Sequence, residues 1–219
     1  MNRIFLPLAL TMSLSLTGCI SFTPTGPIGE PQVKAATSIE HAAQIAEVSI
    51  SDPGVNAEKR LTASRQLTDQ ITHYVEKSDY FNKVVVFPVK AGDDDMVLKF
   101  DLTSLKGKRS THPGYIPGAI LTLTIWIWVN GPVDVDTFDI AGTLTIEDRH
   151  GKQLAKTSEK IDISQNVGIY DRDYWAPRLG ANYLNQLVAQ LLASATRQLP
   201  PSAVQASVAA PALQQAAAQ

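Results

Sequence analysis

Histidine and acidic residues are the first candidates for metal or acid-base chemistry in this sequence. The four histidines, in four separate segments, are His41, His73, His112 and His150. No two of them have the spacing that ligands on one element need. A run of three aspartates at 93–95 lacks the alternating ligands, the glycine and the closing glutamate of an EF-hand loop. We therefore expect solvated or turn histidines, turn acids and no metal site.

The sequence motifs of the main enzyme classes are absent. The chain contains no HExxH, GxGxxG, Walker loop or G-x-S-x-G sequence, and only one cysteine. We expect a protein that is not an enzyme and that uses no cofactor. The 19 Lys and Arg residues nearly balance the 21 Asp and Glu residues, with a net charge of -2. This balance argues against a nucleic-acid partner.

The single cysteine, Cys19, follows a segment typical of a secretory signal. Arg3 provides a short basic start, residues 4–16 are apolar, and small residues precede the cysteine. The apolar run is shorter than the roughly 20 residues that a transmembrane helix needs. We predict a signal peptide at residues 1–18. A lone cysteine in an exported chain cannot close an intramolecular disulfide, so Cys19 needs another use.

The run Leu16-Thr17-Gly18-Cys19 resembles the lipobox of bacterial lipoproteins. The resemblance implies cleavage before Cys19, a diacylglycerol thioether on its sulfur and acylation of its amino group. Several acyl chains anchor a protein stably without a transmembrane helix. Ile20 stands where an Asp would resemble an inner-membrane retention signal, so the resemblance implies the outer membrane, periplasmic side. The alternative is an ordinary signal peptide followed by an accidental or buried cysteine.

The rest of the chain divides into three parts by composition. Residues 19–37 are rich in proline and glycine and lack periodicity, which predicts a flexible tether. Residues 199–219 hold eight Ala, four Gln and three Pro with no charge and no aromatic residue, which predicts a disordered tail. Residues 38–198 have the size of one domain.

Apolar periodicity within that domain predicts an α+β fold. Apolar residues recur every three or four positions at 56–78, and again towards Leu199 in a segment that begins near Pro177, which indicates two helices. Alternation indicates five strands, at 84–89, 96–103, 121–129, 137–147 and 152–164. The last two form a hairpin across the turn at 148–151. We predict two layers, a mainly antiparallel sheet of about five strands packed by the two helices.

The segment 38–51 fits two structures. A capping box beginning at Thr37 favours a short helix, whereas the alternation of Ala46, Val48 and Ile50 favours a strand. We leave this segment open. Asp173 is a candidate cap for the last helix.

Two groups of residues are candidates for an interaction surface. Lys106, Lys108 and Arg109 cluster in a predicted loop, 106–118, that lacks any acid and would suit phosphate headgroups or an acidic partner. Trp126 and Trp128 lie on one face of the predicted strand at 121–129, opposite its aliphatic face. For the basic residues, the alternative is a solvated hairpin loop. For the tryptophans, the alternative is that the loop or the amino-terminal segment covers them. We expect partial cover, which leaves one tryptophan for a partner.

The order of these patterns resembles small envelope lipoproteins with a domain similar to the TolB amino-terminal and CsgG-like folds. The resemblance covers residues 57–198 and rests on "LTDQITHYVEKSDYFNKVVV", "DDDMVLKFDLTSL", "TFDIAGTLTIEDRHGKQLAKTSEKI" and the closing leucine-rich helix. It implies a non-enzymatic assembly or export accessory on the inner leaflet of the outer membrane. The partner would be another envelope protein or further copies of the chain. The alternative function is a lipid- or glycan-binding envelope module.

Overall fold

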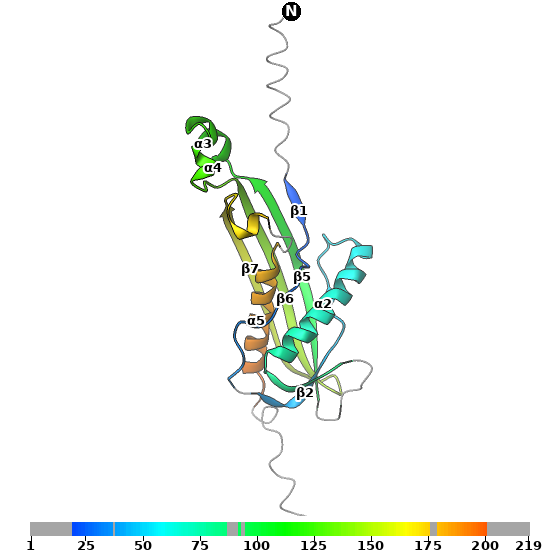
Figure 1. Ribbon diagram of the computed structural model, residues 1–219. Coiled ribbons are helices and arrows are strands. Elements are labelled where there is room, and N and C mark those ends of the chain that lie inside the picture. Colours follow the sequence, from blue (N-terminus) through cyan, green and yellow to red (C-terminus); the bar gives the residue numbers. More distant parts are fainter. Residues whose placement is uncertain (1–18, 37, 87–91, 93–94, 176–178, 201–219) are drawn as a thin grey trace, which may run out of the picture.

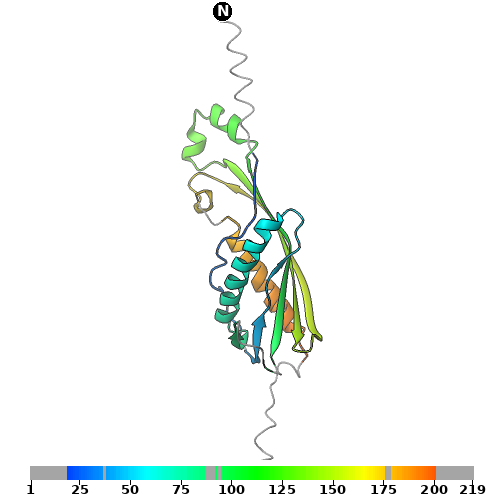
Figure 2. The ribbon, with the colours of Figure 1, turned by 90° about the vertical axis from the view of Figure 1, so that its right-hand side faces the viewer.

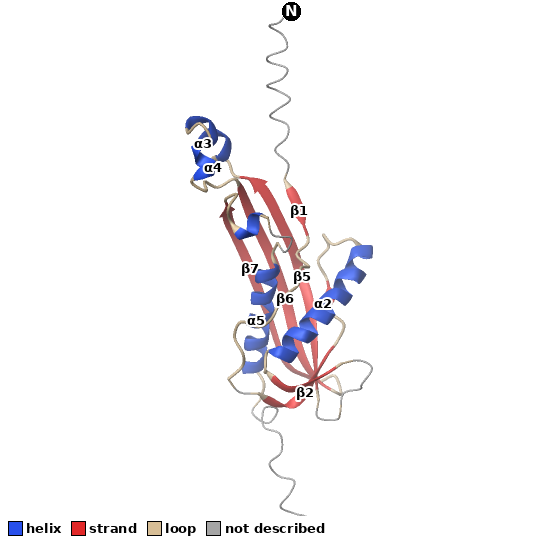
Figure 3. Cartoon of the chain, viewed as in Figure 1, coloured by secondary structure: helices blue, strands red, loops and turns tan. Residues whose placement is uncertain are grey.

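The computed structural model describes residues 19–36, 38–86, 92, 95–175 and 179–200. The described elements form an α+β domain, which confirms the predicted fold class (Figures 1 and 3). In chain order they are β1 (Ile20–Phe22), β2 (Ile39–Ile45), β3 (Ser49–Ile50), α2 (Ala57–Lys77), β4 (Phe81–Val85), β5 (Met96–Thr111), α3 (Tyr115–Leu121), α4 (Ile125–Trp128), β6 (Asp134–Asp148), β7 (Gln153–Val167), a 3-10 turn (Arg172–Tyr174) and α5 (Ala181–Arg197).

Within the described residues the sheet has seven strands and is mixed, so it is larger than the mainly antiparallel sheet of about five strands that we predicted. Its order is β4-β2-β5-β6-β7, and β1 and β3 also pair with β5. The long strands β5, β6 and β7 are antiparallel, as expected for the hairpin at 148–151. The short strands β2, β3 and β4 add parallel pairs. The segment 38–51, left open from sequence, supplies β2 and β3.

The helices α2 and α5 lie over one face of the sheet and form the second layer (Figure 2). The stripe of α2 buries Leu67, Ile71 and Val75, and α5 buries Leu187 and Leu191 among its contacts. The helix α2 begins after Asn56, whose side-chain oxygen accepts a hydrogen bond from the Glu58 amide. Both helices predicted from periodicity are therefore confirmed, and the core lies between them and the sheet.

The strand β5 continues to Thr111, through the residues that we expected to form a basic loop. The pairing with β6 shifts register between Leu102 and Ser104. Because of this bulge, the next core residue after Leu102 is Leu105, three positions on, and not the residue two positions on. The alternation of apolar residues in the sequence is interrupted at this point. Lys106, Lys108 and Arg109 are consequently strand residues, and the loop prediction was wrong.

The segment 121–129, predicted to be a strand, forms parts of two short helices instead. The strands β5 and β6 pair directly with each other from Met96 to Thr111, so the segment between them has no neighbouring strand. Its backbone groups pair locally, for example from the Thr122 amide to the Gly118 carbonyl at 3.0 Å. The sheet therefore lacks the strand on which Trp126 and Trp128 were placed.

The segment 19–36 packs on the domain, which contradicts the flexible tether. The strand β1 pairs antiparallel with β5, matching Ile20 with Arg109 and Phe22 with Gly107. Further along, Ile28 is buried, its amide donates to Gln70 and its carbonyl accepts from Asn185. Phe22 and Ile28 supply apolar anchors that the proline and glycine content had obscured.

The predicted tail, 199–219, is described only at residues 199 and 200. Leu199 is buried against the core, so the first residue of that segment belongs to the domain. Pro177, residues 1–18 and the aspartates at 93 and 94 lie outside the described residues. Among the described helices, none is long and apolar enough to span a bilayer.

Candidate functional site

The connection between β5 and β6 forms a small helical unit, residues 112–131, which we call the tip. It projects from the end of the sheet beyond the pair Thr111 and Asp134, where β5 and β6 finish their pairing (Figure 1). The tip contains α3 and α4 and holds no Asp, Glu, Lys or Arg.

The tip exposes most of its apolar side chains. Leu121 is 83% exposed and Leu123 is 85% exposed, and both lie between α3 and α4 or at their ends. Fourteen large apolar side chains are exposed among the described residues, and half of them lie in the tip: Ile116, Ile120, Leu121, Leu123, Ile125, Trp128 and Val129. Exposed large apolar side chains gathered in one small unit make that unit a candidate interaction surface.

The two tryptophans of the tip have different environments. Trp126 is partly buried and closes the tip: its ring lies against Gly118 and Gly131, and its Nε1 donates to the Pro132 carbonyl at 3.1 Å. A Cβ atom at either glycine would overlap that ring, so both positions need glycine. Trp128 is 75% exposed. One tryptophan therefore supports the tip, and the other belongs to its surface.

Asn130 fastens the tip to the loop after β7. Its Nδ2 donates to the Asp171 carboxylate at 2.8 Å, and its Oδ1 accepts from the Tyr170 amide at 3.0 Å. Asp171 also accepts from the Gly168 amide at 2.6 Å. Two exposed aromatic side chains, Tyr170 and Trp175, belong to this loop. The tip and these aromatic residues therefore form one surface.

Arg109 pairs with Asp136, a buried acid on β6, and so is not free to meet an acidic partner. Arg109 Nε and Nη2 each lie 2.6 Å from an oxygen of Asp136, whose side chain is fully buried. This carboxylate raises the pKa of Arg109 above its ordinary value. The guanidinium also donates to the carbonyls of Asp173 and Tyr174. Arg109 thus ties the loop after β7 to the sheet.

The other predicted basic residues, Lys106 and Lys108, are exposed on β5. In the ladder Lys106 lies opposite Asp139, and Lys108 opposite Thr137. The acid-free basic cluster expected from sequence does not form. Asp173, predicted to cap the last helix, lies in the 3-10 turn, whereas α5 begins after Gly180.

Cys19 lies at the same end of the sheet as the tip. It is exposed and directly precedes β1, whose first residue, Ile20, pairs with Arg109. The same antiparallel register places Cys19 opposite Ser110, two residues before the tip. With strands about 4.8 Å apart and about 3.3 Å per residue, Cys19 lies about 8 Å from the base of the tip.

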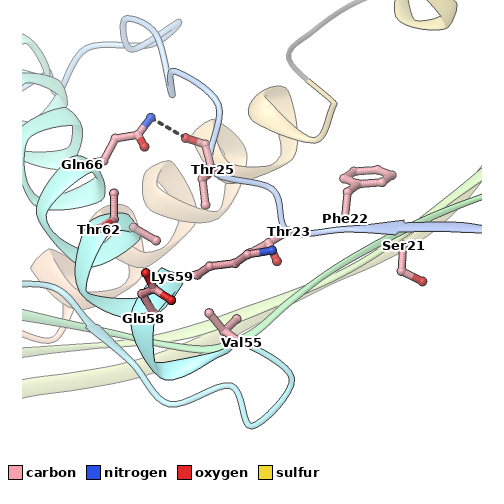
Figure 4. Close-up of a pocket in the computed structure, with 10 residues that line it drawn as sticks. Ser21, Phe22, Thr23, Thr25, Val55, Glu58, Lys59, Thr62 and Gln66 are labelled. Carbon is pink, nitrogen blue, oxygen red and sulfur yellow. Dashed lines mark hydrogen bonds between the residues drawn. The ribbon is translucent and has the colours of Figure 1, made fainter.

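A groove of about 640 Å³ lies between β1 and the start of α2 (Figure 4). Phe22 and Thr25 line one side, and Glu58 and Lys59 the other. Gln66 Nε2 donates to the Thr25 carbonyl across it at 3.2 Å.

The histidines lie apart in the described structure. His73 is on α2 with Glu76 at 3.8 Å, His112 accepts from the Gly114 amide, His150 is in the turn after β6, and His41 is on β2. No group of three or more potential metal ligands occurs among the described residues.

Comparison with known proteins gives weak similarities only. No family model and no curated protein matches the chain. Solved structures that resemble it include a protein of the DUF330 family from Xanthomonas campestris, at 10% identity over 75% of this chain and 89% of that chain, with a TM-score of 0.39. A neuraminyllactose-binding hemagglutinin homolog from Helicobacter pylori has 14% identity, covers 80% and 92%, and has a TM-score of 0.40. A minor lipoprotein from Acinetobacter baumannii has 13% identity, covers 74% and 96%, and has a TM-score of 0.33. Similarities of this size do not establish a shared fold or function.

Proposed function

We propose that the chain is an outer-membrane lipoprotein, anchored on the periplasmic side by acylated Cys19, and that its domain is a non-enzymatic structural or assembly accessory. Its partner is another envelope protein or further copies of itself. The lipobox from Leu16 to Cys19 supports the anchor. The TolB amino-terminal or CsgG-like resemblance belongs to the same proposal.

One observation carries this proposal: the anchoring residue and an uncharged apolar surface lie at the same end of a stiff sheet. The paired strands β5, β6 and β7 run the length of the domain without a break, apart from bulges (Figure 1). Because β1 is part of this sheet, acyl chains on Cys19 would hold the whole domain in a set orientation. An accessory that positions partners at a membrane needs such an orientation.

The outer edge of the sheet offers a place for a protein partner. The 15-residue strand β7 is at the end of the strand order and pairs with β6 alone among the described strands. Lys156 and Lys160 on it are exposed, which is how edge strands limit unspecific pairing. A partner strand added here would run along the whole length of β7, from the end near the tip to the far end of the sheet.

A glycan-binding module is the second candidate. A groove of about 860 Å³ beside α5 is lined mainly by hydroxyl and amide side chains, among them Tyr80, Asn182 and Gln186, and also by Glu159, Arg172 and Arg197. Hydroxyl and amide groups donate and accept hydrogen bonds without charge, as sugar hydroxyls require. This groove, rather than the basic cluster, is where that function would lie.

The anchor is tested by Cys19→Ser, with Ser21→Ala on the neighbouring exposed position of β1 as the matched control. We expect Cys19→Ser to abolish acylation, seen by mass spectrometry, and to remove the protein from the outer-membrane fraction, while Ser21→Ala behaves as wild type. If Cys19→Ser still floats with outer membranes, the anchor lies elsewhere.

The accessory role is tested by purification of the acylated protein in mild detergent. A stoichiometric protein partner, or a defined oligomer of the chain, supports it. A tightly carried saccharide with no protein partner would favour the glycan-binding module instead.

A further inference from the structure

We propose that the tip, together with Tyr170 and Trp175, inserts into the interface of the bilayer that receives the acyl chains of Cys19. The inference rests on the proposed function, because it takes Cys19 as the anchor. It adds a second, protein-borne membrane contact and names its ligand as a phospholipid surface.

The composition of the tip fits a lipid surface. It has no Asp, Glu, Lys or Arg from residue 112 to residue 131, and its exposed large apolar side chains are leucine, isoleucine, valine and tryptophan. Membrane-surface segments place leucine and tryptophan among the headgroups and the first part of the acyl chains. The short helices α3 and α4 satisfy most of their backbone groups internally, for example from the Val129 amide to the Ile125 carbonyl. That pairing lowers the desolvation cost of burying a backbone in lipid.

The position of the tip fits the same surface. Cys19 lies about 8 Å from the base of the tip by the strand register, so acyl chains entering the bilayer at Cys19 bring the tip to the headgroups. Figures 1 and 2 both show α3 and α4 at the end of the sheet where β1 begins. Lys108, exposed on β5 near this end, would face anionic headgroups.

The aromatic residues next to the tip fit the boundary of a bilayer. Trp128, Tyr170 and Trp175 are 75%, 59% and 74% exposed. Tryptophan and tyrosine collect at the interface, because their rings are apolar while an N–H or O–H group stays in contact with water. The bonds from Asn130 to Asp171 and Tyr170 hold two of the contributing segments together, so the surface is built before it meets lipid.

A protein partner for the same surface is the other outcome of the test. Protein interfaces surround an apolar centre with a polar rim that carries charged residues. The tip has none of its own, and two acids near its base already have partners: Asp136 pairs with Arg109, and Asp171 accepts from Asn130 and Gly168. The uncharged surface, beside a lipid-bearing residue, favours the bilayer.

The test uses the intact acylated protein in vesicles of phosphatidylethanolamine and phosphatidylglycerol that carry bromine on their acyl chains. Bromine quenches tryptophan fluorescence only when the ring reaches it. We expect quenching in the wild type and its loss in the double variant Leu121→Glu/Leu123→Glu. Leu61→Glu is the matched control, because Leu61 is 62% exposed on α2, away from the tip.

A second measurement removes the contribution of the acyl chains. The chain that begins at residue 19 and carries Cys19→Ser should bind the same vesicles weakly, by the tip alone. Loss of one leucine side chain that inserts into the lipid should weaken this binding roughly tenfold or more. The double variant should therefore bind at least tenfold less, and Leu61→Glu should bind as the parent does.

The outcomes separate the two proposals. If Cys19 carries no lipid in the native protein, the anchor fails, whereas binding of the unacylated chain still reports on the tip. If the acylated protein is held in vesicles but shows no quenching, or if the double variant is quenched like the wild type, tip insertion is overturned and the anchor stands. Crosslinking of the tip to another copy of the chain within vesicles would also overturn it.

Discussion

Removing the charge of Asp136 should destabilise the end of the domain that carries the tip. Its carboxylate is fully buried and receives two bonds of 2.6 Å from Arg109, whose side chain is only 15% exposed. The variant Asp136→Asn keeps the volume but leaves the guanidinium without its counter-charge. Breaking one side of a buried pair costs about 3 to 5 kcal/mol.

The effect is measured by denaturant and thermal unfolding of the chain that begins at residue 19 with Cys19→Ser. For a domain of this size about 1 kcal/mol lowers Tm by roughly 2 to 4 °C, so Asp136→Asn should lower Tm by about 6 to 20 °C. The double variant Arg109→Met/Asp136→Leu removes both charges and should recover part of the loss. Recovery stays incomplete because the Asp173 and Tyr174 carbonyls lose their donor.

Two results would refute this reasoning. A change in Tm below about 2 °C for Asp136→Asn would show that the pair contributes little. A double variant whose loss of stability equals the sum of the losses of Arg109→Met and Asp136→Leu would show that Arg109 and Asp136 act independently, since residues in contact give a non-additive interaction energy in the mutant cycle. Lys99→Met is a control for an exposed ion pair, with Glu147 at 2.6 Å, and should change stability by no more than about 1 kcal/mol.

Stopping the chain after Leu199 should leave Tm almost unchanged, whereas stopping after Gln198 should cost about 2 to 5 kcal/mol, because Leu199 is buried; equal melting curves would contradict this. Burial raises the pKa of Tyr74 to about 12, so the folded state favours the neutral phenol more strongly than the unfolded state does. The free energy of unfolding should therefore be highest below about pH 10 and should fall by about 2 to 3 kcal/mol as the pH rises through 12. Urea unfolding across that range should show the fall in the wild type and a weaker one in Tyr74→Phe. Trp126→Ala should cost about 1 to 3 kcal/mol and expose the tip to proteolysis, whereas Trp128→Ala should stay within about 0.5 kcal/mol; the reverse order would show that their environments are misassigned.

The sequence predicts the parts of the fold where one pattern continues without interruption. From residue 137 to 147 every second residue is apolar, and the structure places Phe138, Ile140, Leu144 and Ile146 in the core. The period of three and four residues in α2 likewise predicts its helix, and the buried residues Leu67, Ile71 and Val75 follow that period, whereas Leu61 is 62% exposed. In these segments the local period predicts the element and most of its buried face without knowledge of the partner elements.

The sequence fails where tertiary pairing decides the structure. A bulge after Leu102 interrupts the alternation of β5, so the sequence does not show that Arg109 belongs to this strand. The pairing of Arg109 with the buried Asp136 could therefore not be predicted either. The alternation of 121–129 predicted a strand. However, β5 and β6 pair directly with each other, so no strand edge is left between them for this segment, and its residues fold into the tip. The candidate residue Trp128 is exposed as one alternative allowed, but in a helix and not on a sheet face. The absence of charge from 112 to 131 was the available signal for the tip.

The proposed anchoring at Cys19 would also limit how far the domain can search for partners. A domain on a flexible linker samples many heights above its anchor, whereas one joined to its anchor through a paired strand would move mainly by lateral diffusion and by rotation about the bilayer normal. Each surface would then keep a nearly constant height: the 16 residues of β5, at about 3.3 Å each, would place its far end about 50 Å from the anchored end. A partner would have to be reached by lateral diffusion and to present its own contact at a matching height. The anchor would thus select complexes by geometry before any side chain is recognised.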